Sequence, residues 1–175
     1  MTTRRIGPID KTLSARHHCH VAIPTGIKRE TIAMHITGIN YTAVAVAAVA
    51  SFIFGGIWYG LLSKQWMAAA NLDEKFVKGS GAGPSPVPFV VAFVALLIMS
   101  WMLAGIFLHL SRGGTPLTLR NGLISGVLIW AGFVMTSLTV NHAFQGAKRA
   151  LTLIDGGHWL GVLLVQSAVL ALMGG

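Results

Sequence analysis

The feature that most constrains this chain is an uninterrupted apolar run at residues 41–62, which contains no charged side chain. As a helix rising 1.5 Å per residue it spans roughly 33 Å, enough to cross a hydrocarbon core of about 30 Å. Three further apolar runs follow at residues 88–110, 121–140 and 157–173. The pattern predicts an all-α polytopic membrane protein whose four transmembrane helices form an antiparallel bundle.

The ends of these runs carry local signals. Asn40 suits an N-cap before the first run, and Pro88 suits the first turn of the second. The connection between the second and third runs is short, which predicts that these two spans are antiparallel neighbours. Residues 63–87 are predicted to be a polar connection, with a charged centre and a Gly- and Pro-rich end. Within it, Trp66 to Leu72 are a candidate for a short interfacial helix lying on the membrane.

Charge placement identifies the surroundings of the chain. Charged residues make up only 10% of it, against about 25% in an ordinary soluble domain. The net charge is +8, yet no Lys or Arg falls inside an apolar run. Basic residues at the ends of spans are expected beside anionic lipid, so the partner is the lipid bilayer and not nucleic acid.

The N-terminal tail, residues 1–33, is basic and lacks a sustained apolar period. We expect it to be disordered or untranslated, with Met34 as the alternative start and residues 34–175 as the transmembrane domain. Its cluster of His17, His18, Cys19 and His20 lacks a second ligand pair, so we predict no metal site there. Counting basic residues from Met34 favours a cytoplasmic 63–87 connection, and counting the tail reverses that result.

Small residues recur on the helices as three GxxxG pairs. In lipid, such residues let two helix backbones approach closely. We predict helix contacts at the six glycines, either within the bundle or, as the sharper alternative, between copies in a homo-oligomer. The six are Gly56, Gly60, Gly122, Gly126, Gly157 and Gly161.

Residue types exclude several activities. The core of each span lacks an ionisable side chain, which argues against ion-coupled transport. Asp155 is the only acid after Glu74, so no paired carboxylates or Ser-His-Asp grouping can be built, and we expect no enzyme and no catalytic residue. Interfacial capping explains His142 and His158 better than haem ligation does, so no cofactor is expected.

The exits of the first and third spans and the entry of the fourth must lie on one side of the membrane. Their polar and aromatic residues therefore share one interfacial layer. They form either an aromatic belt facing headgroups or an inward pocket, with Tyr59, Asn141 and His158 turned inside. The ligand-binding candidates are Trp58, Tyr59, Asn141, Phe144, His158 and Trp159.

Short motifs in this layer carry a family resemblance. They are Gly56-x-Trp58-Tyr59, Lys64-x-Trp66, Gly132-Phe133, Asn141-x-x-Phe144 and Gly157-x-Trp159-Leu160. In this order and spacing the chain resembles domain of unknown function 1761, a bacterial family of small four-span membrane proteins, over about residues 34–175. The resemblance implies a multi-pass protein of the inner membrane and no known activity.

Two functions remain open. The first is a non-enzymatic membrane protein that binds a small apolar or lipid-like ligand, or a partner subunit. The second is an uncoupled small-solute carrier or channel acting as an oligomer. Transport would require the polar residues of the spans to line one continuous face; these are Ser51, Ser100, Ser125, Thr136, Ser137, Gln166 and Ser167.

Overall fold

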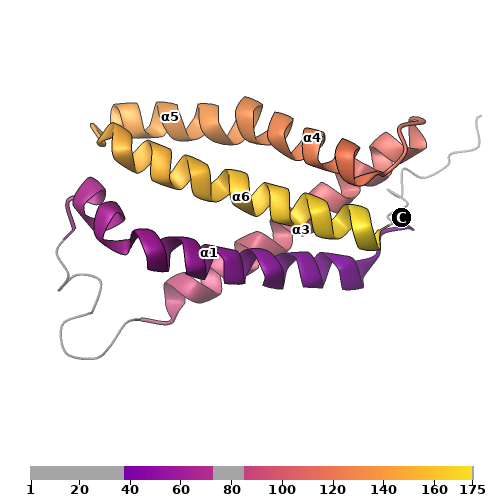
Figure 1. The fold of residues 1–175 in the computed structure, drawn as a ribbon, viewed down its shortest axis with the longest axis horizontal. Helices are drawn as coiled ribbons and strands as arrows, with labels where there is room; N and C mark the ends of the chain where they lie inside the picture. The colour runs from indigo at the N-terminus through magenta and orange to yellow at the C-terminus, as the bar shows by residue number, and fades with distance from the viewer. Residues whose placement is uncertain (1–37, 73–84, 175) are drawn as a thin grey trace, which may run out of the picture. The chain divides into compact units, whose positions relative to one another are not determined.

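The computed structural model describes residues 38–72 and 85–174. The predictions for the tail at residues 1–33, and for the charged and Gly-rich part of the connection at residues 73–84, lie outside this part of the chain. Within the described residues every regular element is helical, and four helical segments are long and apolar enough to cross a membrane (Figure 1). The predicted all-α fold with four spans is confirmed.

The first span is α1 (Tyr41–Ala70), and it is longer than predicted. Asn40 caps it as expected, since its side chain accepts a hydrogen bond from the amide of Ala43 at 3.1 Å. Residues 63–70 were predicted to belong to the connection, with a separate interfacial helix from residue 66, and this is wrong because they continue α1. They contain no Gly or Pro, so the helix continues until Asn71, which adopts the left-handed conformation with φ 54°.

The second span, α3 (Val87–Arg112), packs mainly on α1. Pro88 lies in its first turn, as predicted. In its middle, the Ser100 hydroxyl donates a hydrogen bond of 2.9 Å to the Val44 carbonyl of α1. Small side chains at this crossing let the two backbones come close enough for a side chain to bridge them.

The third span consists of α4 (Leu119–Ile129), the π-helical turn η1 (Trp130–Val134) and α5 (Met135–Phe144). In the π-turn the amide of Met135 bonds to the carbonyl of Trp130, five residues earlier. The extra residue rotates every later side chain by about 100° relative to a regular helix. This rotation decides which residues of α5 face the rest of the bundle.

The second and third spans are not the close neighbours that the short turn predicted. They touch near the turn, where a methyl group added at Gly122 would lie 3.6 Å from the Phe107 ring. Beyond that point they separate, because α3 packs on α1 whereas α4 packs on α6. A short turn keeps two helices close only where they meet the turn. Beyond it, the side chains on each helix surface determine which helix it packs against.

The fourth span, α6 (Arg149–Met173), contacts all the other spans and has the largest buried share of the four (Figure 1). It starts at residue 149 and not at 157, so the predicted start is wrong and Asp155 lies inside the helix. It runs antiparallel to α1. At one end Asn40 donates a hydrogen bond to the Met173 carbonyl at 2.8 Å, and at the other Lys148 donates one to the Ala68 carbonyl at 2.7 Å.

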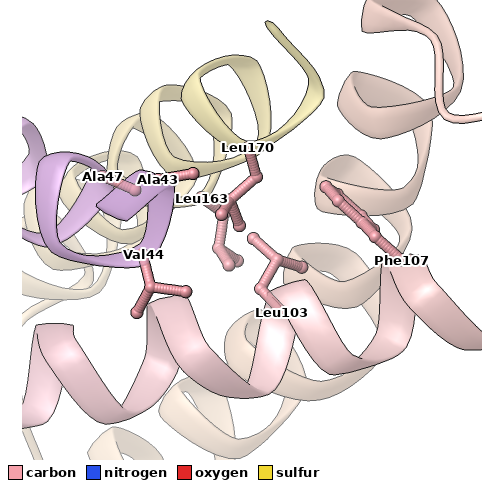
Figure 2. Close-up of a cluster of buried hydrophobic side chains, with 7 residues drawn as sticks. All are labelled: Ala43, Val44, Ala47, Leu103, Phe107, Leu163 and Leu170. Atoms are coloured by element: carbon pink, nitrogen blue, oxygen red, sulfur yellow. The ribbon is translucent and has the colours of Figure 1, made fainter. Parts of the chain in front are cut away.

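One half of the bundle is held by close apolar packing. Side chains from α1, α3 and α6 meet in a buried cluster, which we call the apolar core cluster (Figure 2). Its small α1 residues bring the helix axes together, so van der Waals contact supplies the stabilisation that hydrophobic burial supplies in water. The cluster consists of Ala43, Val44, Ala47, Leu103, Phe107, Leu163 and Leu170.

Four of the six predicted glycines lie at helix contacts. A methyl group added at Gly126 would lie 2.6 Å from the Ser167 hydroxyl, and Gly122 is similarly close to α6. One added at Gly157 would lie 2.9 Å from the ring of Trp58, and one at Gly161 would overlap the ring of Phe54 on α1. These glycines therefore set the distance between α6 and its neighbours.

The other two glycines make no helix contact within the bundle, so for them only the contact between copies stays a prediction. Methyl groups added at Gly56 and Gly60 would meet no atom of the described chain within 4 Å. The close approach occurs one residue earlier, where a methyl group at Gly55 would lie 2.9 Å from the Nε2 atom of His158. The GxxxG spacing of α1 is therefore present in the sequence without serving the contact between α1 and α6.

Candidate functional site

Asp155 is the centre of a polar cluster at the end of the bundle where α1 finishes and α6 begins. It is the only carboxylate side chain among the described residues. Its Oδ1 atom accepts hydrogen bonds from the Tyr59 hydroxyl at 2.9 Å and from the Trp66 indole N–H at 3.1 Å. Its Oδ2 atom lies 3.9 Å from the Nε2 atom of His142. We call these four residues the Asp155 cluster.

The lengths of two helices bring this cluster together. Tyr59 and Trp66 are seven residues apart, so they share one face of α1, but only because α1 continues past residue 62. Asp155 faces them because α6 begins at residue 149. The side chain of Asp155 is 17% exposed, and its two donors replace water that burial removes. The cluster thus lets a carboxylate reside in an apolar helix.

Two more indoles bind the backbone on either side of Asp155. Trp58 donates a hydrogen bond to the Ile154 carbonyl at 3.2 Å, and Trp130 donates one to the Gly156 carbonyl at 2.8 Å. Each helix carbonyl has a second lone pair that can accept such a bond. As a result, α1 and the third span are both pinned to the same turn of α6 by directional bonds.

His158 lies one turn further along α6 in a ring of aromatic side chains. Its ring centroid is 4.7 Å from that of Tyr59 and 5.0 Å from that of Trp159. The residue is 8% exposed, and its Nδ1 atom has no hydrogen-bond partner in the described part of the chain. His158 is therefore held by ring packing and by the close approach of Gly55 rather than by a polar network.

The structure brings together four of the six predicted ligand-binding candidates. Tyr59, His158 and Trp159 are in ring contact, and Trp58 lies against the same turn of α6. The other two, Asn141 and Phe144, are left out: both are exposed, Phe144 at 92%. The interior position on α5 is taken by His142, which is 9% exposed.

The π-turn explains why His142 and not Asn141 faces α6. In a regular helix that presents Gly126 and Trp130 to α6, positions near residue 141 would lie on the same face. The inserted residue of η1 moves this face by one position, to His142. The pattern of apolar residues in the sequence cannot reveal this rotation, because the residues on both sides of the π-turn are apolar.

Sequence reasoning missed Asp155 and His142 as site residues, although one signal was present. An acidic residue within or beside an apolar span is rare and needs a partner. Asp155 was placed in a connection because the predicted fourth span began only at residue 157. Counting it as part of the span would have made it the one acidic side chain in the described spans to explain.

A groove opens between α5 and α6 beside the Asp155 cluster, and we call it the α5–α6 groove. Its volume is about 480 Å³. Its lining combines apolar side chains with polar ones, among them Arg149 at the start of α6. The lining residues are Met135, Thr139, His142, Ala143, Ala147, Arg149, Thr152 and Leu153.

His142 connects the groove to the carboxylate. Its Nδ1 atom lies 2.9 Å from the Thr152 hydroxyl, which lines the groove, while its Nε2 atom faces Asp155. The hydroxyl of Thr139 is bound to the Met135 carbonyl of its own helix at 2.7 Å. In residues 38–72 and 85–174, no three His, Cys, Asp or Glu side chains gather to hold a metal ion.

Comparison with known proteins gives one match. A family model described as "Protein of unknown function (DUF1761)" matches residues 42–171, which includes all four spans. No curated protein and no solved structure matches the chain.

Proposed function

Because the chain belongs to the DUF1761 family, which is defined without a function, we propose that this multi-pass membrane protein is a non-enzymatic binding protein for a lipid-like amphiphile. Its site in this proposal is the α5–α6 groove. Apolar helical spans are the form that proteins of a bacterial inner membrane take, so we assign it to that membrane.

The observation that carries the proposal is the composition of the groove. Its volume of about 480 Å³ lies within the range of small-molecule sites. Arg149 and Thr152 offer polar groups to the groove, and Met135 and Leu153 offer apolar surface. A ligand with a polar head and an apolar body satisfies both kinds of side chain, whereas a purely polar solute satisfies only the first.

Binding is favoured over catalysis by the geometry beside the groove. Thr152, His142 and Asp155 are placed in the order of a nucleophile, a base and an orienting carboxylate. However, the distance of 3.9 Å between His142 and Asp155 exceeds a hydrogen bond, so the base is not oriented. The oxygen of Asp155 that accepts bonds is used by α1 instead.

The carrier alternative gains no support from the polar residues of the spans. Gln166 lies fully buried at the centre, donating hydrogen bonds to Ser51 at 3.0 Å and to the Leu96 carbonyl at 3.1 Å. Thr136 is exposed on the third span and bonded to its own helix. Of the seven residues, four are buried, Ser125 is half-buried, and Thr136 and Ser137 are exposed, whereas a solute pathway needs a continuous face.

The test is to fill the groove. Leu153→Trp and Ala143→Trp place an indole in it, and Leu172→Trp is the matched control, because Leu172 is 71% exposed on the same helix outside the groove. Purified proteins in mild detergent are extracted, and bound lipid per protein is measured by mass spectrometry. We expect several-fold less lipid on the two groove variants than on the wild type or Leu172→Trp.

Two outcomes would overturn the proposal. Equal lipid retention by all four proteins would show that lipid is held elsewhere. Loss of a co-purifying protein without any loss of lipid would show that the groove holds a partner subunit.

A further inference from the structure

Arg149 is the cation available where the groove meets the start of α6. It lines the groove and is exposed, and its side chain makes no hydrogen bond or ion pair with the described residues. The adjacent Lys148 differs, since its ammonium group donates to the Ala68 carbonyl at 2.7 Å. The first turn of α6 contains no acidic residue that would neutralise Arg149.

The groove offers nothing of the opposite charge. None of its lining residues is a carboxylate, and Asp155 directs its bonded oxygen towards α1. The ammonium group of a zwitterionic headgroup would therefore find no counter-ion in the lining. An anionic headgroup has a phosphate and no ammonium group, so it does not need a carboxylate in the groove lining.

We propose that the α5–α6 groove selects phospholipids with an anionic headgroup, and that Arg149 binds the phosphate. This inference rests on the proposed function and names the ligand class of that same site. A guanidinium can give two parallel hydrogen bonds to a phosphate, which makes it a stronger and more oriented ligand than a lone ammonium. The Thr152 hydroxyl lies beside it in the lining, and Leu153 and Met135 receive the first part of an acyl chain.

General attraction of basic residues to anionic lipid must be separated from selection by this groove. Arg120 is a matched control within the chain. It is also exposed and also lies in the first turn of a helix, α4, but at the opposite end of the bundle and outside the groove. Any effect of net charge alone would be the same for both arginines.

The experiment uses the full chain, delipidated in detergent and mixed with equal amounts of phosphatidylglycerol and phosphatidylethanolamine, with adducts counted by native mass spectrometry. The wild type should prefer phosphatidylglycerol. Arg149→Gln should lower this preference roughly tenfold, as for loss of one charge-assisted contact. Arg149→Lys should keep part of the preference, and Arg120→Gln should keep all of it. Thermal melts verify that each variant is folded.

The results separate the two proposals. If Leu153→Trp lowers binding of both lipids while Arg149→Gln leaves the preference unchanged, the groove binds lipid but the headgroup assignment is wrong. Equal loss of preference in Arg149→Gln and Arg120→Gln would likewise overturn it, because a net-charge effect would explain both. If Leu153→Trp changes neither lipid, the proposed function itself fails.

Discussion

The two ends of this bundle are stabilised by different interactions, apolar packing at one end and side-chain hydrogen bonds at the other. At one end the apolar core cluster packs small α1 side chains against α3 and α6, with few side-chain hydrogen bonds (Figure 2). At the other end the Asp155 cluster joins α1, the third span and α6 through Tyr59, Trp66 and two further indoles. Ala47 and Tyr59 lie on the same helix, about 18 Å apart.

The difference shows where a membrane protein can place a binding site. Close apolar packing needs no ligand to satisfy its atoms, and the pocket at that end, about 180 Å³ and lined in part by Ala43, Phe107 and Leu170, is smaller than the α5–α6 groove of about 480 Å³. Directional bonds between aromatic and acidic side chains hold helices whose surfaces do not interlock, so a groove can remain beside them. The apolar end should therefore be sensitive to side-chain size, and the Asp155 end to donor and acceptor chemistry.

The largest effect is expected at the apolar end. Gly126→Leu would force a side chain against the Leu163 carbonyl, which an added methyl group would already approach to 3.3 Å. Backbone cannot move aside cheaply, so we expect a loss of about 3 kcal/mol in unfolding free energy. Gly60→Leu is the control and should change stability by less than about 0.5 kcal/mol. The measurement is denaturant unfolding in detergent micelles. Similar stability of the two variants would contradict the packing described here.

A smaller effect is expected from chemistry at the other end. Asp155→Ala leaves the Tyr59 hydroxyl and the Trp66 indole without their acceptor, and should cost about 1–2 kcal/mol. Asp155→Asn keeps an oxygen in place and should recover at least half of this loss. The same unfolding assay applies. If the Asn variant were as unstable as the Ala variant, charge and not hydrogen bonding would hold this end.

The smallest effect tests the rotation that the π-turn introduces. His142→Ala removes a buried ring bonded to Thr152 and should cost about 1 kcal/mol. Asn141→Ala alters an exposed residue and should be neutral within about 0.5 kcal/mol. A larger loss of unfolding free energy for Asn141→Ala than for His142→Ala would mean that the third span is a regular helix in which Asn141 faces α6.

The number of spans and their helical structure could be predicted from the sequence, because the thickness of the bilayer sets the length of an apolar run. The sequence was insufficient at the ends of α1 and α6. There, the helices extend beyond the apolar runs: residues 63–70 of α1 and residues 149–156 of α6 are helical without being uniformly apolar, so hydropathy alone did not predict the helix ends.

The candidate site could be predicted only in part from the sequence. Because successive spans cross the membrane in alternating directions, Tyr59, His158 and Trp159 were predicted to share one interfacial layer, and their rings are in contact. The one-residue insertion in η1 could not be read from an apolar stretch, so Asn141 was expected where His142 stands. Gly55 and Gly56 are adjacent glycines, and only the position of His158 decides which of them makes the contact.

The most direct test of the central claim is a structure of the wild-type protein in nanodiscs of mixed phosphatidylglycerol and phosphatidylethanolamine. We expect one ordered lipid whose apolar part lies along Leu153 and Met135 and whose phosphate contacts Arg149. An empty α5–α6 groove, or lipid density equally ordered around every span, would contradict this expectation.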